Sequence, residues 1–170
     1  SDKKMIKIRS DACKQSAKIL GISKIQFLDY PDMKLDSIPH LEINKQLEKI
    51  IKKFKPKIVY SPPSHDLNKD HQKVFESALV ITRPFSSSVK KLLCYELPGP
   101  VREPFHPSVY ENIEKEFSHK IKAFKMYKTE VMKFPHPRSI KAIENLAIQR
   151  GVESSLNMAE SFQLIRSIEE

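Results

Sequence analysis

A short apolar run that ends in two prolines most constrains how this chain folds. The β-branched and aromatic run from Ile58 to Tyr60 predicts a buried strand. Pro62 and Pro63 end that strand, and the helical periodicity of residues 72–82 predicts a helix soon after. In open α/β sheets, ligands bind beyond the carboxyl ends of the strands. The loop between this strand and this helix is therefore the first candidate for a functional site.

That loop gathers His65, Asp66, Asn68, Asp70 and His71. Imidazole is the commonest protein ligand for zinc, and a neighbouring carboxylate can fix its tautomer, a role that suits Asp70 beside His71. Asp66 and Asn68 are also suited to capping the following helix, which is the more ordinary role for such residues. Because a catalytic zinc site takes three protein ligands, one histidine with its carboxylates does not complete one, and further ligands must come from elsewhere.

The order of predicted elements indicates an α/β fold. Helices are predicted over residues 4–20, 41–54, 72–82, 110–133 and 140–150, and strands over 24–28, 58–60 and 92–97. Residues 159–168 fit a strand and a short helix equally well. Strands that alternate with helices favour a Rossmann-like, mostly parallel sheet flanked by helices. No second domain boundary is visible, so we expect a single domain over residues 1–170.

Glycine, serine and proline residues mark where several of the predicted helices begin or end. Gly21 and Gly151 are predicted to stop the helices before them, and Ser139 is predicted to cap the helix that begins at residue 140. Residues 98–107 are rich in proline and predict a long loop over the sheet edge. A loop of this length is more typical of a functional element than of a plain connection.

The amino-acid composition restricts the kinds of molecule that this chain is expected to bind. The chain has a net charge of +9, but its lysines are spread over many predicted helices, which is more typical of a solvated surface than of a nucleic-acid-binding stripe. Only three glycines occur, so no glycine-rich phosphate loop is expected. No apolar run approaches membrane-spanning length. Cys13 and Cys94 lie far apart within a predicted helix and strand, so we expect no disulfide framework and a cytoplasmic protein.

Seven short motifs, in order along the chain, carry a resemblance to a known family. They are Arg9 with residues 17–22, residues 66–71, Thr82-Arg83-Pro84, Phe105-His106-Pro107, residues 134–139, Arg150-Gly151 and residues 159–162. On these motifs the whole chain resembles the PIG-L (LmbE-like) N-deacetylases, zinc-dependent enzymes that remove acetyl groups from N-acetylglucosamine-type sugars. The last motifs are most similar to the branch found in bacterial glycan and polysaccharide loci.

The resemblance implies a metal site with one member in this sequence. His71 matches the family's later histidine ligand. The other ligands and the general base belong to an N-terminal Ala-His-Pro-Asp-Asp element, which does not occur in the 170 residues. The strand that carries that element, expected before the first helix, is also missing. The resemblance therefore implies a deacetylase domain that is incomplete at its amino end.

The resemblance also implies roles for other residues. Many members have a histidine where this sequence has Asn68, and that histidine assists the tetrahedral intermediate; Asn68 can donate a hydrogen bond but cannot shuttle a proton. Asp66, Asn68 and Asp70 are the catalytic candidates, and His65 is a further candidate for the missing histidine's work. The substrate-binding candidates are Arg9, Arg83, His136 and Arg138; a salt bridge or helix cap is the alternative for the last three.

Three functions remain open at this point. The first is a zinc-dependent hydrolase that removes an N-acetyl group from an amino sugar or glycoconjugate, with the 170-residue chain alone inactive. The second is a non-catalytic sugar-binding or scaffold relative that has lost its metal. The third, a nucleic-acid binder, rests only on the net charge of +9 and is not expected. The sequence leaves the oligomeric state open, a homo-oligomer included.

Overall fold

The structure of the chain, a computed structural model, describes residues 3–169. The chain forms two compact units. The sheet unit consists of Tyr30–Val109 with Ser161–Glu170, and the helical unit consists of Ser1–Asp29 with Tyr110–Glu160. Each unit combines segments from distant parts of the chain, and the single domain over residues 1–170 stays a prediction.

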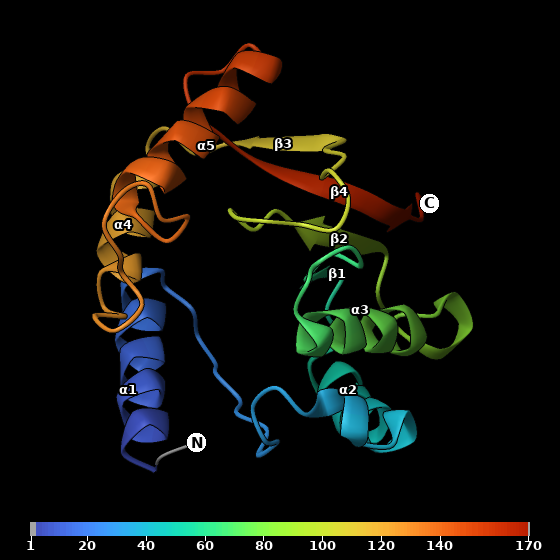
Figure 1. Ribbon diagram of the computed structural model, residues 1–170. Helices are drawn as coiled ribbons and strands as arrows, with labels where there is room; N and C mark the ends of the chain where they lie inside the picture. The colour runs from blue at the N-terminus through green and yellow to red at the C-terminus, as the bar shows by residue number, and fades with distance from the viewer. Residues whose placement is uncertain (1–2, 170) are drawn as a thin grey trace. The chain divides into compact units, whose positions relative to one another are not determined.

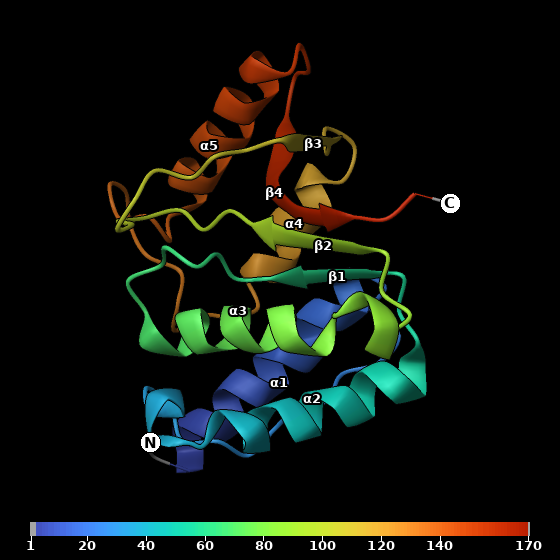
Figure 2. The same cartoon turned by 90° about the vertical axis from the view of Figure 1, so that its right-hand side faces the viewer.

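The sheet unit contains most of the strand residues and the longest stretch of alternating elements (Figure 1). In chain order its elements are η1 (Leu35–Ser37), α2 (His40–Phe54), β1 (Ile58–Ser61), α3 (Lys69–Ile81), η2 (Pro84–Ser86) and β2 (Lys91–Tyr95), with most of β4 (Ala159–Ser167). Helices α2 and α3 pack against each other beside β1 and β2 (Figure 2). The strand at residues 58–61 and the helices on either side of it confirm the prediction.

The core of the sheet unit forms between these two helices and the strands. Ile51 of α2 and Ile81 of α3 pack with Val89, and Leu47 and Val59 cover the cluster. At about 25 cal/mol for each Å² of apolar surface buried, such side chains supply most of the driving force for folding. Because Ile81 is the last residue of α3, this packing holds the carboxyl end of that helix against α2 and β1.

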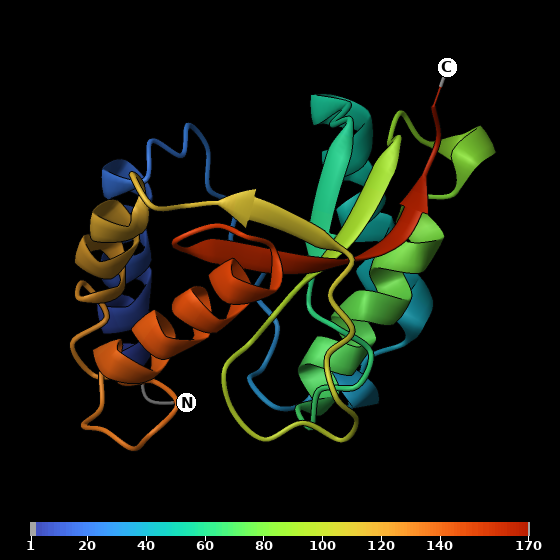
Figure 3. The same cartoon turned by 90° about the horizontal axis from the view of Figure 1, so that it is seen from above.

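The sheet is mixed, which corrects the prediction of a mostly parallel sheet. The strand order is β1-β2-β4-β3, where β3 is Val109–Asn112. β1 and β2 run parallel, but β2 and β4 run antiparallel, with a register shift between Leu92 and Leu93 (Figure 3). The backbone bonds Ser108 N to Phe162 O and Ile113 N to Met158 O make the β4–β3 pair antiparallel as well. Element order predicts crossovers only while strands and helices alternate, and β3 and β4 are not joined by a single crossover helix.

The helical unit is built around small side chains. Its helices are α1 (Lys3–Ile19), α4 (Phe117–Phe124) and α5 (Ile140–Glu153). Ala12 and Ala17 of α1 and Ala123 of α4 are buried, which lets α1 and α4 approach closely. Gly21 has a φ of 69° and ends α1, as predicted, because its neighbours' N–H groups turn back to the last carbonyls of the helix.

Two predicted elements are wrong. Residues 24–28 form no strand; Ile25 and Phe27 are 38% and 53% exposed, and a strand needs a neighbour for its backbone hydrogen bonds. The predicted helix over residues 110–133 is instead β3, a turn and the short helix α4. The Asn112 side chain accepts a hydrogen bond from Glu114 N at 3.0 Å and forms that turn, a local bond that helical periodicity does not reveal.

The last helix and strand resolve the remaining expectations. Ser139 caps α5 by accepting a hydrogen bond from Ala142 N at 3.1 Å, as predicted. Gly151 does not stop α5, which continues to Glu153. A Cβ at Gly151 would lie 2.6 Å from the carbonyl oxygen of Leu156, so glycine is needed there for close backbone approach. Residues 159–167 form a strand. Within residues 3–169, no helix combines the length and apolar character needed to cross a membrane.

Candidate active site

The loop between β1 and α3 forms the candidate site in the sheet unit. Asn68 is the N-cap of α3: its side-chain oxygen accepts a hydrogen bond from Asp70 N at 2.8 Å. The cap starts the helix at Lys69, three residues before the apolar periodicity begins. Asn68 thus takes the capping role that the sequence left open. The cap uses its side-chain oxygen, and the amide N–H₂ group is the part of the side chain that can donate hydrogen bonds.

Asp66 organises the loop. One carboxylate oxygen accepts a hydrogen bond from Asn68 N at 2.8 Å, and the other lies 2.7 Å from Nδ1 of His71. Its backbone carbonyl accepts a further bond from the side chain of Gln72 at 2.6 Å. An ionised carboxylate only accepts hydrogen bonds, so this contact places a proton on Nδ1 of His71, and in the neutral imidazole Nε2 then keeps its lone pair. The His71 side chain is 38% exposed, which leaves Nε2 available to a ligand.

Asp70 does not support His71, although the sequence suggested that pairing. Its two carboxylate oxygens accept hydrogen bonds from the backbone N–H groups of Met33 at 2.7 Å and Leu35 at 2.9 Å. Asp66 occupies the supporting position instead. Asp70 therefore fixes the segment around residue 34 beside the start of α3, and a catalytic role for Asp70 stays a prediction.

The proline-rich loop closes over the same stretch. Residue Asp66 forms an isolated antiparallel bridge with Val101, and the carbonyl of His65 accepts a hydrogen bond from Arg102 N at 3.0 Å. The ring of His65 lies 5.7 Å from that of Phe105 and is 6% exposed. Its Nε2 is buried without a hydrogen-bond partner within the described residues. The predicted loop over the sheet edge thus holds the backbone on which Asp66 is placed.

Tyr95 was missed by the sequence analysis. Burial raises the pKa of its phenol, and the negative charge of Asp66 and the neighbouring Cys94 raise it further. β1 and β2 are parallel with Ser61 opposite Cys94, so Tyr95 lies just beyond the end of β1. The parallel pairing of residues 58–61 with 91–94 is the signal that would have found it, because the carboxyl ends of parallel strands meet at one edge.

The described residues form no metal-binding group of their own. His71 with Asp66 behind it has the carboxylate–histidine arrangement that supports a metal-ligating imidazole. Across residues 3–169, no group of three or more histidine, cysteine, aspartate or glutamate side chains is placed to hold a metal ion. His71 would supply one ligand to such a site, and the described residues do not complete it.

The helical unit brings two of the substrate-binding candidates together. Arg9 Nη2 lies 3.3 Å from one carboxylate oxygen of Glu130, and the guanidinium of Arg138 donates to the other. Arg138 N also donates to Nδ1 of His136 at 3.0 Å. Glu130 had no motif to mark it in the sequence. The remaining candidate, Arg83, belongs to the sheet unit and lies at the opposite end of α3 from His71, roughly 18 Å away along the helix.

The sequence model of the PIG-L family, described as GlcNAc-PI de-N-acetylase, matches residues 1–82. This match covers just under half of the 170 residues, and the similarity to that family is established for this segment. This segment contains Arg9, β1 and the loop with Asp66, Asn68 and His71, so the family expected from the sequence is confirmed where the candidate site lies. Arg83, His136 and Arg138 fall outside the matched segment.

Solved structures with the same fold extend the likeness along the chain. A conserved protein from Thermus thermophilus has a TM-score of 0.78 and 21% identity, with 96% of this chain and 76% of that one covered. The N,N'-diacetylchitobiose deacetylase from Pyrococcus horikoshii has a TM-score of 0.75 and 20% identity, with 94% of this chain and 63% of that one covered. This chain thus spans less than two thirds of the length of that deacetylase.

A third structure shows that this fold carries more than one reaction. The 4-carboxy-2-hydroxymuconate hydratase GalB from Pseudomonas putida has a TM-score of 0.77 and 18% identity, with 100% of this chain and 77% of that one covered. At these identities the similarities establish the fold, and the reaction must be argued from the site.

Proposed function

We propose that the protein belongs to a zinc-dependent hydrolase that removes the N-acetyl group from an N-acetylglucosamine-type sugar or glycoconjugate. The observation that carries this proposal is the orientation of His71. Oδ2 of Asp66 lies 2.7 Å from Nδ1 of His71, which fixes the ring and leaves Nε2, on its other side, as the atom for a metal. The match of residues 1–82 to a de-N-acetylase family supports the same reaction class.

The loop residues have separate tasks in this proposal. Asp66 keeps His71 in one tautomer and excludes rotation of its ring. Asn68 offers its amide N–H to the acetyl oxygen of the substrate, since its side-chain oxygen is already used by Asp70 N. Asp70 holds residues 33–35 in place beside the helix start. Because the described residues supply one metal ligand, no hydrolytic step is assigned to the metal.

The substrate class is supported by the neighbours and by the arginines. Among proteins with this fold, one deacetylates N,N'-diacetylchitobiose and another is an A40926 pseudoaglycone deacetylase. Arg9 and Arg138, which converge on Glu130, are our candidates for contacts with the sugar hydroxyls or with an anionic group of a glycoconjugate. The two free cysteines, Cys13 and Cys94, agree with a cytoplasmic location.

A second function is favoured by one observation. Asn68 replaces a histidine that the family uses, and the described residues do not complete a metal site. A sugar-binding relative without a metal would keep the fold and the arginines. It would need neither the histidine at position 68 nor a complete set of metal ligands. This alternative predicts sugar binding without acetate release.

Acetate release separates the two functions. We would compare the 170-residue chain with the same chain extended at its amino end by the family's strand and Ala-His-Pro-Asp-Asp element, using N,N'-diacetylchitobiose as substrate. The extended chain is expected to bind zinc, measured by elemental analysis, and to release acetate, whereas the 170-residue chain should not. His71→Ala in the extended chain should remove the activity.

Two results would contradict the proposal. Acetate release by the 170-residue chain at the rate of the extended chain would refute the need for ligands and a base outside it. Sugar binding by an extended chain that takes up no zinc and releases no acetate would favour the non-catalytic relative.

A further inference from the structure

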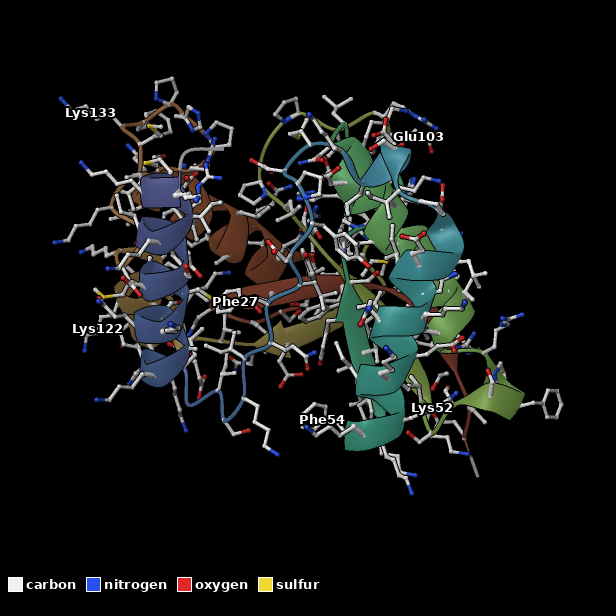
Figure 4. All side chains as sticks on the ribbon, turned by 90° about the horizontal axis from the view of Figure 1, so that it is seen from below. Phe27, Lys52, Phe54, Glu103, Lys122 and Lys133 are labelled. Atoms are coloured by element: carbon white, nitrogen blue, oxygen red, sulfur yellow. The ribbon has the colours of Figure 1, made fainter. Side chains whose placement is uncertain are left out.

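A basic and aromatic surface lies at the amino end of β1, away from the candidate site. Its members are exposed side chains of the last turn of α2, of the segment that joins α2 to β1, and of the turn after α3. We call this surface the basic tip: Lys52, Lys53, Phe54, Lys55, Lys57, Arg83 and Phe85. Phe85 is fully exposed, at 107%, and Phe54 is 40% exposed. Figure 4 shows Lys52 and Phe54 at the same end of α2.

Hydrogen bonds hold the two segments of the basic tip side by side. The hydroxyl of Ser88 donates to the carbonyl of Pro56 at 3.0 Å. The carbonyl of Lys57 accepts bonds from Lys90 N at 2.8 Å and Lys91 N at 3.0 Å. Phe85 therefore lies next to the lysines that follow α2, and the tip is one surface of the sheet unit.

The charge of this surface is almost entirely positive. Neither residues 49–65 nor residues 77–95 include an aspartate or glutamate. The nearest acids are Glu48, whose carboxylate lies 3.9 Å from Nζ of Lys52, and Glu169, which follows the strand residue paired with Lys91. The lysines are thus not spread evenly over the sheet unit, although the sequence suggested a dispersed pattern.

We propose that the basic tip docks on an anionic lipid surface. Lysines close to such a surface are attracted to its headgroups, and an exposed phenyl ring adds apolar area that enters the headgroup boundary. Phe85 stands at the apex of a short turn, bounded by Arg83 and Ser86, where it can enter lipid without moving the fold. Stable attachment to membranes requires two such signals together, and the basic tip carries both.

A nucleic acid fits this surface less well. Single strands bind by stacking bases on open aromatic faces along a positively charged groove. The ring of Phe54 already carries the ammonium group of Lys53, 5.5 Å from its centroid. Phe85 projects outward, whereas a stacking platform is recessed. Lysines act as point charges on diffuse headgroups. The cluster has four lysines and one arginine, and Nε of that arginine, Arg83, already donates to the carbonyl of Val80 at 3.0 Å.

The location of the basic tip separates docking from catalysis. The tip lies at the amino end of β1, and His71 lies beyond its carboxyl end. A protein docked by the tip keeps the candidate site open to substrate. Variants of the tip therefore test docking without touching Asp66, Asn68 or His71, and loss of docking says nothing about deacetylation.

The test is co-sedimentation of the 170-residue chain with vesicles of phosphatidylglycerol and phosphatidylcholine. We expect binding at about 0.1 M salt that falls steeply at higher salt, and little binding to phosphatidylcholine alone. The triple variant Lys52→Glu, Lys53→Glu, Lys55→Glu should bind at least about a hundredfold more weakly, since each lysine near the surface contributes about fivefold. Phe85→Ser should weaken binding about fivefold without a change in charge.

A matched control distinguishes a surface from net charge. Lys122→Glu, Lys125→Glu and Lys128→Glu change the charge equally in the helical unit, and they should leave most of the binding intact. An equal loss in both triple variants would overturn the proposal, as would Phe85→Ser binding like the parent. Salt-sensitive binding to single-stranded DNA without binding to vesicles would also overturn it and would identify a nucleic-acid surface. Circular dichroism of each variant checks that the fold is retained.

Discussion

Asp66 and Asn68 of one short loop and His71 in the first turn of α3 lie close together in the sheet unit, whereas Arg9, Glu130 and Arg138 come from two distant segments of the helical unit. Two local features hold the first group. Asn68 caps α3, and the carboxylate of Asp66 accepts hydrogen bonds from the backbone N–H of Asn68 and from the ring of His71. The second group is held by ion pairs across the fold. Local hydrogen bonds orient a side chain with little freedom, while exposed ion pairs leave long side chains free to exchange partners.

The two units differ in how firmly they hold their polar side chains, and this difference suits them to different tasks. The His71 ring is held by a short hydrogen bond to a carboxylate that is only 14% exposed, so salt should screen this contact little. The two guanidinium groups are half-exposed around one carboxylate and can release Glu130 when an anionic or polar ligand arrives. We therefore expect the sheet unit to fix the position of the His71 ring, and the arginines of the helical unit to adjust the affinity for a ligand.

The largest effect should follow from Asp66→Ala. This change leaves the backbone N–H of Asn68 and the Nδ1 proton of His71 without their acceptor, in a site where the Asp66 side chain is 14% exposed. We expect a loss of about 3 kcal/mol in the free energy of unfolding, measured by urea denaturation. An unchanged unfolding midpoint would mean that the loop is held by the Val101 bridge rather than by the carboxylate.

Asp66→Asn isolates the effect on the ring. The amide keeps an acceptor for Asn68 N but presents an N–H donor to His71, which favours the tautomer with the proton on Nε2. Stability should fall by less than in Asp66→Ala, whereas zinc affinity in the extended chain should fall about 10–100-fold. Nitrogen chemical shifts of the imidazole report the tautomer. Retention of the Nδ1–H form would contradict this account of the pair.

The next effect compares two helix caps. Asn68→Ala and Ser139→Ala each remove a side-chain acceptor, from Asp70 N and Ala142 N respectively. Each should cost about 1 kcal/mol in unfolding free energy. Only Asn68→Ala should also change substrate binding by the extended chain, because only that cap lies in the loop with His71. Equal effects on binding would break the distinction between a structural and a functional cap.

These residues show which parts of the structure could be predicted from the sequence. The turn chemistry around Asn68 and Ser139 and the periodicity of α2 and α3 are local, so the strand–loop–helix unit could be predicted. The pairing of β4 between β2 and β3 is decided by contacts between distant segments, and periodicity says nothing about them. Residues 24–28 have the composition of a strand, but a strand exists only with a partner. Glu130 and Tyr95 were missed for the same reason, because each acquires its role from residues far along the chain.

A smaller effect should follow from Glu130→Gln in the helical unit. The change removes the shared partner of Arg9 and Arg138 while keeping the shape of the side chain. We expect a loss of roughly 0.5–1 kcal/mol at low salt that largely disappears in high salt. Asp66→Asn serves as the comparison, since its effect should persist in high salt. A salt-independent loss at Glu130 would mean that this cluster is as rigid as the loop.

The smallest effect concerns two tyrosines, Tyr127 and Tyr95, at alkaline pH. Burial and the neighbouring Cys13 thiol raise the pKa of Tyr127 in the helical unit to about 12. In the unfolded chain the phenol titrates near its ordinary value of about 10. Between these two values the folded state holds more protons than the unfolded state, so stability falls as the pH rises from about 10 to about 12.

Tyr127→Phe should remove this part of the pH dependence and leave stability below about pH 10 nearly unchanged. Tyr95 gives the contrast, because part of its raised pKa comes from the charge of Asp66. Asp66→Asn should therefore lower the pKa of Tyr95 and leave that of Tyr127 at about 12. Phenolate absorbance, compared among the two single variants and the parent, separates the tyrosines. An unchanged pKa of Tyr95 would show that the charge of Asp66 does not act on it, and a shift of both tyrosines would show that the effect of Asp66 is not local.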